Sequence, residues 1–460
     1  MSAMNVMGLY SGIDMSTVEQ LIQAESSRGV KFTKQKETYQ KQQTAWKDVN
    51  SRLDNLYKKF EVLKNPETFN SKTVKTSNEG FVSVSSTSNA DTGEYKLKVS
   101  QLATATRLTG TQADLGLLSE DSKLTINNGE SDFEFDITTE MDLKDIKNLI
   151  NETSSDSKVK ASIVDNRLIL TRSDLGNKTL SVDGDAVQAL GFKSSELVSV
   201  EAVKGQSAIL FIDGLEITKD SNTIDDVIEG VTFKLQNVHE DNKSDTLTIS
   251  DNTEKAATAM KELVDQYNSL NSFIKQQTSV GDPSAENNVT GTLVGDSSIA
   301  RLQTNLRSMF TRNIETASGS VNNLQDLGVQ IDRNGTATFN SDKLIKKLEE
   351  DPDGVVNFFH SSEQVEDESG SKTTKLSGFA NAARSLVNEY ISSTTGIIKT
   401  KSETYDRLIK DVNQRIETFN KRIETKREQY IKQFTALDTA MMQAESQIQF
   451  MMGQLGGNDK

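Results

Sequence analysis

The residue types that most often carry enzyme or metal chemistry are scarce in this chain of 460 residues. Cysteine is absent, which excludes thiolate zinc sites, disulfides and cysteine nucleophiles. Histidine occurs only at His239 and His360, too few for a multi-histidine metal site, and a serine–histidine–aspartate relay would have to use one of these two. His239 stands in a polar stretch over 237–243, and His360 follows an apolar pair at the end of a predicted helix. We expect both to be ordinary surface or helix-end residues.

Clusters of carboxylates are the other candidate chemistry, because placed acids catalyse proton transfer and bind cations. The clusters are Asp225-Asp226, Glu349-Glu350-Asp351 and Glu366-Asp367-Glu368. Such runs are more typical of solvated faces and helix ends. The segment 351–354 lacks the alternating ligands and distal glutamate of a calcium loop and predicts a turn. No carboxylate pair stands out as a glycosidase would require, and no glycine-rich phosphate loop occurs, so we expect no catalytic residue, no metal site and no cofactor.

Composition also limits the classes of partner. The chain has 52 Lys and Arg against 67 Asp and Glu, a formal net charge of −15. Nucleic-acid binding needs a basic face, so this class is disfavoured. No apolar run approaches the length of about 18 residues that a transmembrane helix needs. The first residues, Met1 to Ile13, lack the pattern of a cleaved signal peptide. We expect a chain that stays in the cytoplasm or is exported without a cleaved signal.

Near the N-terminus, apolar and large residues recur with the spacing of a coiled coil. The stripe runs from Phe32 to Leu63 in steps that alternate between three and four, and Asn65-Pro66 ends the helix. The polar members Gln35 and Gln42 predict layers that pack less tightly than leucine layers. The residues that we expect to pack on this stripe are Phe32, Tyr39, Trp46, Val49, Leu53, Leu56 and Phe60.

A second stripe near the C-terminus begins at Tyr405 and has the same alternation, with one extra step of four from Tyr430 to Phe434. Such a stutter locally unwinds a left-handed supercoil. Neither stripe can be buried by its own helix, so we expect the two terminal helices to pair with each other. The residues that we expect to pack here are Val412, Ile416, Phe419, Ile423, Tyr430, Phe434, Leu437, Met441 and Ile448.

Between the two ends, the sequence changes to the two-residue alternation of strands. Strand patterns dominate over 72–109 and 208–235, and the stretch 110–205 mixes short strands with a helix from Met141 to Glu152. Asn334-Gly335 predicts a hairpin over 329–339. The predicted fold class is therefore α+β multidomain, with terminal coiled-coil helices, a helical body and two nested β-rich head domains.

The expected domains follow from these changes of pattern. Because the strands lie between two helical regions, both the helical body and the outer head domain take residues from two separate parts of the chain. The expected bounds are 1–40 and 420–460 for the terminal coiled-coil leg, 41–72 and 251–419 for the helical body, 73–109 and 206–250 for a β-rich head domain, and 110–205 for an inserted α+β head domain.

Several short segments carry a family resemblance through their order along the chain. They are Gly8-Leu9-Tyr10-Ser11-Gly12-Ile13-Asp14 before the long helix, then Gly93-Glu94-Tyr95, Val99-Ser100-Gln101-Leu102-Ala103, Phe211-Ile212-Asp213-Gly214, Val264-Asp265-Gln266-Tyr267-Asn268 and Leu293-Val294-Gly295-Asp296. Together they resemble the bacterial flagellar hook-associated protein 2 family, the filament cap proteins. The similarity is weakest over 110–205. One departure is Gly29, where members of the family often have proline.

The resemblance implies a structural protein and no chemical reaction. It implies export through the flagellar type III channel to the extracellular tip of the flagellum, where copies of the chain form a homo-oligomeric ring that promotes folding and insertion of flagellin. The implied partners are other copies of the chain, flagellin, hook–filament junction proteins and a dedicated export chaperone at the C-terminal helix. The alternative is a surface adhesin that binds mucin or glycans through the head domains, although aromatic residues make up only 6% of the chain.

Overall fold

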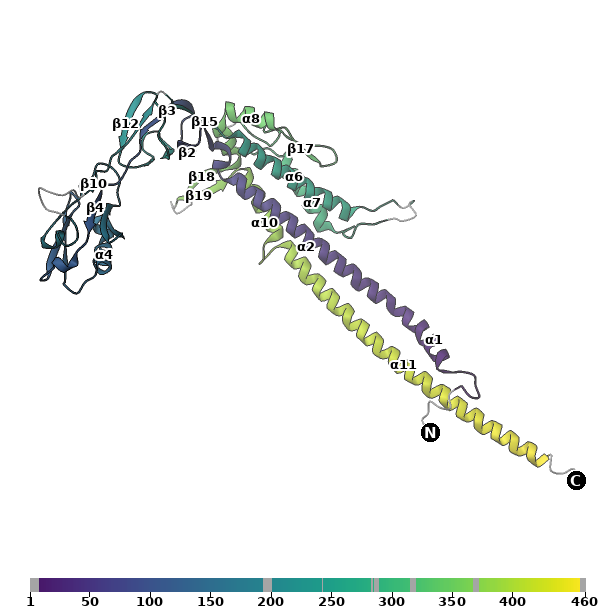
Figure 1. Cartoon of the computed structure of the whole chain (residues 1–460). Coiled ribbons are helices and arrows are strands. Elements are labelled where there is room, and N and C mark those ends of the chain that lie inside the picture. Colours follow the sequence, from purple (N-terminus) through teal and green to yellow (C-terminus); the bar gives the residue numbers. More distant parts are fainter. Residues whose placement is uncertain are drawn as a thin grey trace. The chain divides into compact units, whose positions relative to one another are not determined.

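The structure is a computed structural model that describes residues 8–192, 201–241, 243–282, 284, 289–314, 320–366 and 372–455. The chain divides into two compact units, one from residues 1–68 with 256–460 and the other from residues 69–255. The first is mainly helical and the second mainly antiparallel sheet, which confirms the α+β multidomain prediction (Figure 1). Asp367 and Glu368 of the third acidic cluster lie outside the described residues.

The first unit is built around two long helices, α2 and α11. Its helices are α1 (Met15–Ser26), η2 (Ser27–Gly29), α2 (Val30–Lys64), α6 (Thr253–Thr278), α7 (Ser297–Thr311), α8 (Ser341–Glu350), α9 (Pro352–Phe359), α10 (Phe379–Ile391) and α11 (Ile397–Leu455). The short helix α3 (Glu67–Asn70) follows α2. Two hairpins complete the unit, β16 (Val329–Ile331) with β17 (Ala337–Phe339) and β18 (Ser361–Glu366) with β19 (Lys372–Ser377).

Side chains at the helix ends explain where several of these helices begin. Asp14 accepts the backbone N–H of Thr17 at the start of α1, and Asn340 accepts that of Lys343 at the start of α8. Asp351 does the same for α9, whose first residue is Pro352. The prediction of a turn over 351–354 is therefore wrong. The aspartate and proline that favour a turn are equally suited to open a helix.

An aromatic cluster holds the helices of the first unit together. The Phe60 ring on α2 lies 5.9 Å from that of Phe379 on α10 and 6.5 Å from that of Phe310 on α7. Tyr267 on α6 packs 4.3 Å from Phe310, and Phe358 on α9 stacks on Phe379 at 5.5 Å. These rings are buried, so five helices share one core.

The described residues of the second unit form four antiparallel sheets. Their strand orders are β1-β15-β3-β11-β12, β13-β14-β2, β10-β4-β8-β7 and β6-β5-β9. The bounds are β1 (Lys72–Thr76), β2 (Val82–Ser86), β3 (Gly93–Gln101), β4 (Arg107–Gln112), β5 (Ser122–Asn127), β6 (Asp132–Ile137), β7 (Val159–Val164), β8 (Arg167–Arg172), β9 (Ser181–Asp183), β10 (Glu201–Val203), β11 (Ala208–Ile212), β12 (Leu215–Lys219), β13 (Thr223–Ile224), β14 (Val231–Leu235) and β15 (Asp245–Asp251). Helix α4 (Leu143–Glu152), α5 (Ser154–Ser157), η3 (Leu115–Leu117) and η4 (Asp185–Val187) connect them.

Two separate hydrophobic cores lie in this unit. One joins the strands on either side of the insertion, because Val99 on β3 lies opposite Leu210 on β11, and Leu247 on β15 lies opposite Tyr95 on β3. The other is formed entirely by residues between Leu108 and Phe192, with α4 packed on β7. The chain thus leaves the first core after β3, completes the second and returns at β11, as two nested β-rich head domains require.

Candidate functional site

The residues that could have supported catalysis are used structurally. His239 is buried, so the prediction of a surface residue is wrong. Its Nδ1 accepts the N–H of Val99 at 3.0 Å, its Nε2 lies 3.1 Å from an Asp245 oxygen, and its ring stacks on Phe81. The hydroxyl of Ser77 donates to the other Asp245 oxygen at 2.9 Å. With aspartate between serine and histidine, no imidazole nitrogen faces the hydroxyl to remove its proton, and the relay geometry is absent.

His360 and Asp226 also make structural contacts. His360 ends α9, as predicted, and its N–H donates to the Val356 carbonyl at 2.8 Å. Asp226 of the first acidic cluster pairs with Lys219. Within the described ranges, no group of three or more His, Asp or Glu residues is arranged to hold a metal ion.

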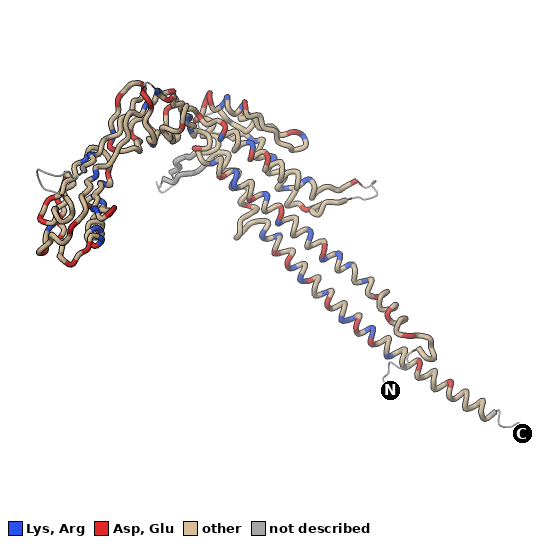
Figure 2. The backbone as a smooth tube through the Cα atoms, viewed as in Figure 1, with Lys and Arg blue, Asp and Glu red and all other residues tan. Residues whose placement is uncertain are grey.

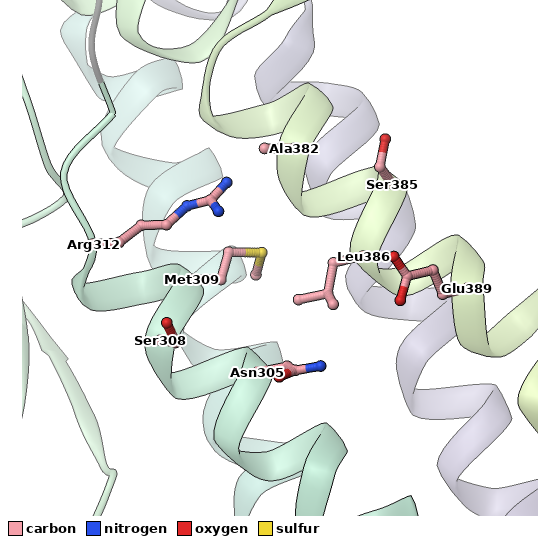
Figure 3. Close-up of a pocket in the computed structure, with 8 residues that line it drawn as sticks. All are labelled: Asn305, Ser308, Met309, Arg312, Ala382, Ser385, Leu386 and Glu389. Carbon is pink, nitrogen blue, oxygen red and sulfur yellow. The ribbon is translucent and has the colours of Figure 1, made fainter.

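A pocket of about 340 Å³ lies between α7 and α10 (Figure 3). Side chains of the two helices line its opposite sides, and Glu389 is the one carboxylate among them. A glycosidase needs two carboxylates across its cleft, so this pocket does not support that reaction. Its lining residues are Asn305, Ser308, Met309, Arg312, Ala382, Ser385, Leu386 and Glu389.

The paired terminal helices are the candidate functional site. α2 and α11 lie side by side, as predicted from their stripes (Figure 1). Tyr39 lies 6.4 Å from Tyr405, and Phe32 lies edge-on to Phe419 at 6.0 Å, so the residue number falls along α2 as it rises along α11. The pair is therefore antiparallel. Lys and Arg as well as Asp and Glu occur along both helices (Figure 2).

The predicted packing residues fall into three groups along the pair. Those on the second half of α2 and two on α11 are buried, namely Trp46, Val49, Leu53, Leu56, Phe60, Val412 and Ile423. Those on the first part of α2, and on α11 where it faces this part and α1, are half-buried, namely Phe32, Tyr39, Ile416, Phe419, Tyr430 and Phe434. Those on the last turns of α11 are exposed, namely Leu437, Met441 and Ile448. The apolar stripe on α2 packs against α11 in its first part, and beyond Trp46 it packs in the helical core with α10.

Ion pairs connect α1 to α11 where the stripe weakens. The Lys426 ammonium on α11 donates to Glu25 on α1 at 2.6 Å. This hydrogen bond is the main reason that the pKa of Glu25 lies below its ordinary value. Val18 and Ile22 of α1 bury their side chains against Ile423. The short helix α1 therefore completes the apolar face that α2 leaves uncovered.

A half-buried hub that the sequence did not single out as a site ties three helices together. Asp296 accepts the N–H of Ser298 at 2.9 Å and so begins α7. Its carboxylate also accepts the indole N–H of Trp46 on α2 at 3.1 Å and the ammonium of Lys401 on α11 at 2.9 Å. Lys401 lies 5.5 Å from the Trp46 ring centroid. Burial raises the pKa of Asp296, but these hydrogen bonds act more strongly together and the net pKa is lowered.

Packing explains why position 29 is a glycine. A Cβ there would lie 2.5 Å from Cε1 of Phe419, a distance that real Cβ atoms essentially never show. Its φ of −77° is ordinary for a helix, so the space and not the backbone requires glycine. The phenyl ring thereby sits directly on the backbone where α1 passes into α2.

The described residues contain no helix that is long and apolar enough to cross a membrane. The two paired helices are the longest among them, and charged residues punctuate both along most of their length.

Comparisons with known proteins cover nearly the whole chain. Residues 205–446 match the family model of the flagellar hook-associated protein 2 C-terminus, residues 11–106 match its N-terminus, and residues 123–174 match the flagellin hook IN motif. Flagellar hook-associated protein 2 of Escherichia coli K12 is 30% identical over an alignment that covers 100% of this chain and 99% of the relative. The A-type protein of Pseudomonas aeruginosa is 28% identical, covering 85% of this chain and 84% of the relative.

The fold matches as well. The crystal structure of the flagellar cap protein FliD from Escherichia coli superposes with a TM-score of 0.59 at 30% identity, covering 79% of this chain and 99% of that chain. The order of helices and nested sheets is thus shared along with the sequence. The chain belongs to the flagellar hook-associated protein 2 family, the flagellar cap proteins, which are structural proteins and not enzymes.

Proposed function

We propose that this protein forms the distal cap of a bacterial flagellar filament and promotes the folding and insertion of exported flagellin at the growing tip. The observation that carries the proposal is the exposed apolar face on the last turns of α11. Its exposed members are Leu437, Met441, Ile448, Met451 and Met452, and Met442 and Phe450 are exposed on other sides of the same turns. A coiled-coil stripe that stays exposed in a single chain is expected to pack against another protein chain.

The proposed partners match the parts of the chain. Other copies join this one in a ring, and α11 reaches toward the filament, where flagellin and the hook–filament junction proteins belong. Before export, a dedicated chaperone covers the same C-terminal helix. The methionines suit this exchange of partners, because their flexible side chains repack readily. The protein then works outside the cell, at the tip of the flagellum.

The finer division of labour is also a proposal. Residues 1–40 with 420–460 act as the leg, 41–72 with 251–419 as the body, and 73–109 with 206–250 and 110–205 as the two head domains. A cap must hold on while the tip beneath it changes, and weakly packed legs permit this. Gln35 is exposed and Gln42 is half-buried, so both dilute the apolar face. Replacing both by leucine is expected to strengthen leg contacts and slow filament growth in motile cells. An unchanged growth rate would remove this part of the proposal.

The ring is tested by mass photometry or multi-angle light scattering on the purified full chain. We expect a closed oligomer of fixed copy number at micromolar concentration. A variant carrying Ile448→Ser, Phe450→Ser and Met451→Ser is expected to lose it, whereas Gln443→Ser, on the same exposed turns, is expected to keep it. A strictly monomeric full chain would contradict the ring.

The action on flagellin is tested by deleting the gene for this protein from a flagellated bacterium. The cells without the gene are expected to release unpolymerised flagellin into the medium, and the intact gene is expected to restore filaments while the triple variant does not. Normal filaments without the gene would refute the proposal.

The adhesin alternative gains no specific support. Glycan sites usually offer aromatic platforms, whereas the exposed large apolar residues of the second unit, within its described part, are aliphatic and scattered. They are Leu117, Val164, Val203, Leu215 and Val238. We therefore keep the cap as the one proposed function.

A further inference from the structure

The first described residues of the chain wrap around one carboxylate of α11. Asp438 accepts the N–H of Gly8 at 2.6 Å on one oxygen. On the other oxygen it accepts the N–H of Ser11 at 2.7 Å and that of Tyr10 at 3.1 Å. The side chain is completely buried by this turn of backbone, with 0% exposed.

Two glycines give the turn its shape. Gly8 has a φ of +89° and Gly12 a φ of +72°, a region that side chains disfavour. With the chain bent in this way, three N–H groups point inward and form a nest for an anion. The next residue after the turn, Asp14, begins α1. The motif that opens the family resemblance thus acquires a physical role, since its glycine spacing builds the nest.

The carboxylate, and not apolar burial, holds this segment. None of the side chains of residues 8–13 is fully buried, and Leu9 and Tyr10 are exposed. In the described part of the chain, Asp438 has no Lys or Arg within ion-pair distance. The charge is therefore balanced by backbone dipoles, and the hydrogen bond from Gly8 contributes most to the lowered pKa of Asp438.

We propose that residues 8–13 and Asp438 form a clasp, in which a carboxylate from α11 fills a backbone nest and fixes the start of the chain to the C-terminal helix. The clasp sets where α1 begins, and so seats Val18 and Ile22 on Ile423. It lies immediately before the exposed apolar turns of α11. It requires nothing of the proposed cap function, because it is a property of the single chain.

Hydrogen–deuterium exchange on the purified full-length protein tests the clasp. We compare the unaltered chain with Asp438→Asn, which keeps the shape but turns a charge-assisted acceptor into an amide. The control is Glu445→Gln, which removes the same charge from an exposed position on the same helix. In the unaltered chain and the control, we expect amides of residues 8–14 to be protected. In Asp438→Asn we expect them to exchange at least about tenfold faster, with residues 46–60 unchanged.

A second variant approaches the clasp from the other side and leaves the carboxylate in place. Gly8→Ala puts a side chain at a positive φ and within 3.2 Å of Asp14. It is expected to accelerate exchange over residues 8–14 as well. Exchange in the unaltered chain at the rate of an unstructured peptide, or equal protection in all four proteins, would overturn the proposal.

Discussion

The C-terminal half of α2, which we call the inner end, and the C-terminal turns of α11 from Leu437, which we call the outer end, carry the same spacing of apolar residues. They differ in whether other helices cover these residues. Leu53, Leu56 and Phe60 are 0% exposed, whereas Leu437 is 42% and Ile448 is 52% exposed. The first set is buried in the helical core of the first unit, and the second set remains largely exposed. A heptad pattern therefore specifies a face, and the neighbouring elements decide whether that face serves as core or is kept for a partner.

The largest expected effect separates these two ends directly. Leu53→Ala should lower the free energy of unfolding by about 2–5 kcal/mol, because it leaves a cavity in a closed core. Ile448→Ala should change it by no more than about 0.5 kcal/mol. Urea unfolding below the concentration at which the chain oligomerises, followed by circular dichroism, measures both. Equal losses would mean that the outer stripe is already buried within one chain.

The hub sharpens the comparison by showing what fixes the inner end. Asp296→Ala should cost about 1–3 kcal/mol, because it leaves the Trp46 N–H and the Lys401 ammonium without their acceptor. Asp411→Ala, which breaks an exposed pair with Arg415, should cost at most about 0.5 kcal/mol. Trp46 is the single tryptophan, so its fluorescence reports the lost contact. Unchanged emission in Asp296→Ala would argue against the hub.

Gly29→Ala probes the joint between the two regions. The new Cβ would clash with the Phe419 ring, and we expect a net loss of about 1 kcal/mol despite the better helix propensity of alanine. The penalty should shrink in a Phe419→Leu background, which a double-mutant cycle measures. Equal penalties in both backgrounds would place the cause elsewhere.

The smallest effect concerns pH and falls on the outer end. Glu25 and Asp438 have lowered pKa values in the folded chain. Groups of this kind stabilise the fold above their unfolded pKa values, and the contribution is lost as pH falls through the folded values. The midpoint temperature of thermal unfolding should therefore be constant between about pH 7 and 5.5 and should fall below about pH 4. Glu25→Gln should reduce this acid sensitivity, whereas Glu445→Gln should leave it unchanged. A steep change near pH 6 would contradict the assignment.

Much of the architecture follows from local pattern. The long helices, the nested sheets and the hairpin at Asn334-Gly335 were predicted, because period and turn chemistry are written in neighbouring residues. The hub and the buried His239 were not, because their contacts join residues far apart in sequence: Trp46 and Asp296 are 250 residues apart. The prediction of a turn at Asp351 was wrong, because an aspartate followed by proline fits both a turn and the start of a helix. Gly29 was noted as a departure from the family's usual proline, but its packing role was not predicted, since it depends on the Phe419 ring that the fold brings against it.

The nest around Asp438 has one more consequence. The hydrogen bond from Gly8 joins residues 430 positions apart in the sequence, so it closes a loop of the chain that contains both compact units. No part of the chain can form it alone, and a nascent or partly emerged molecule lacks one of its two halves. A fragment that ends before residue 438 therefore leaves the backbone N–H groups of residues 8, 10 and 11 without this acceptor.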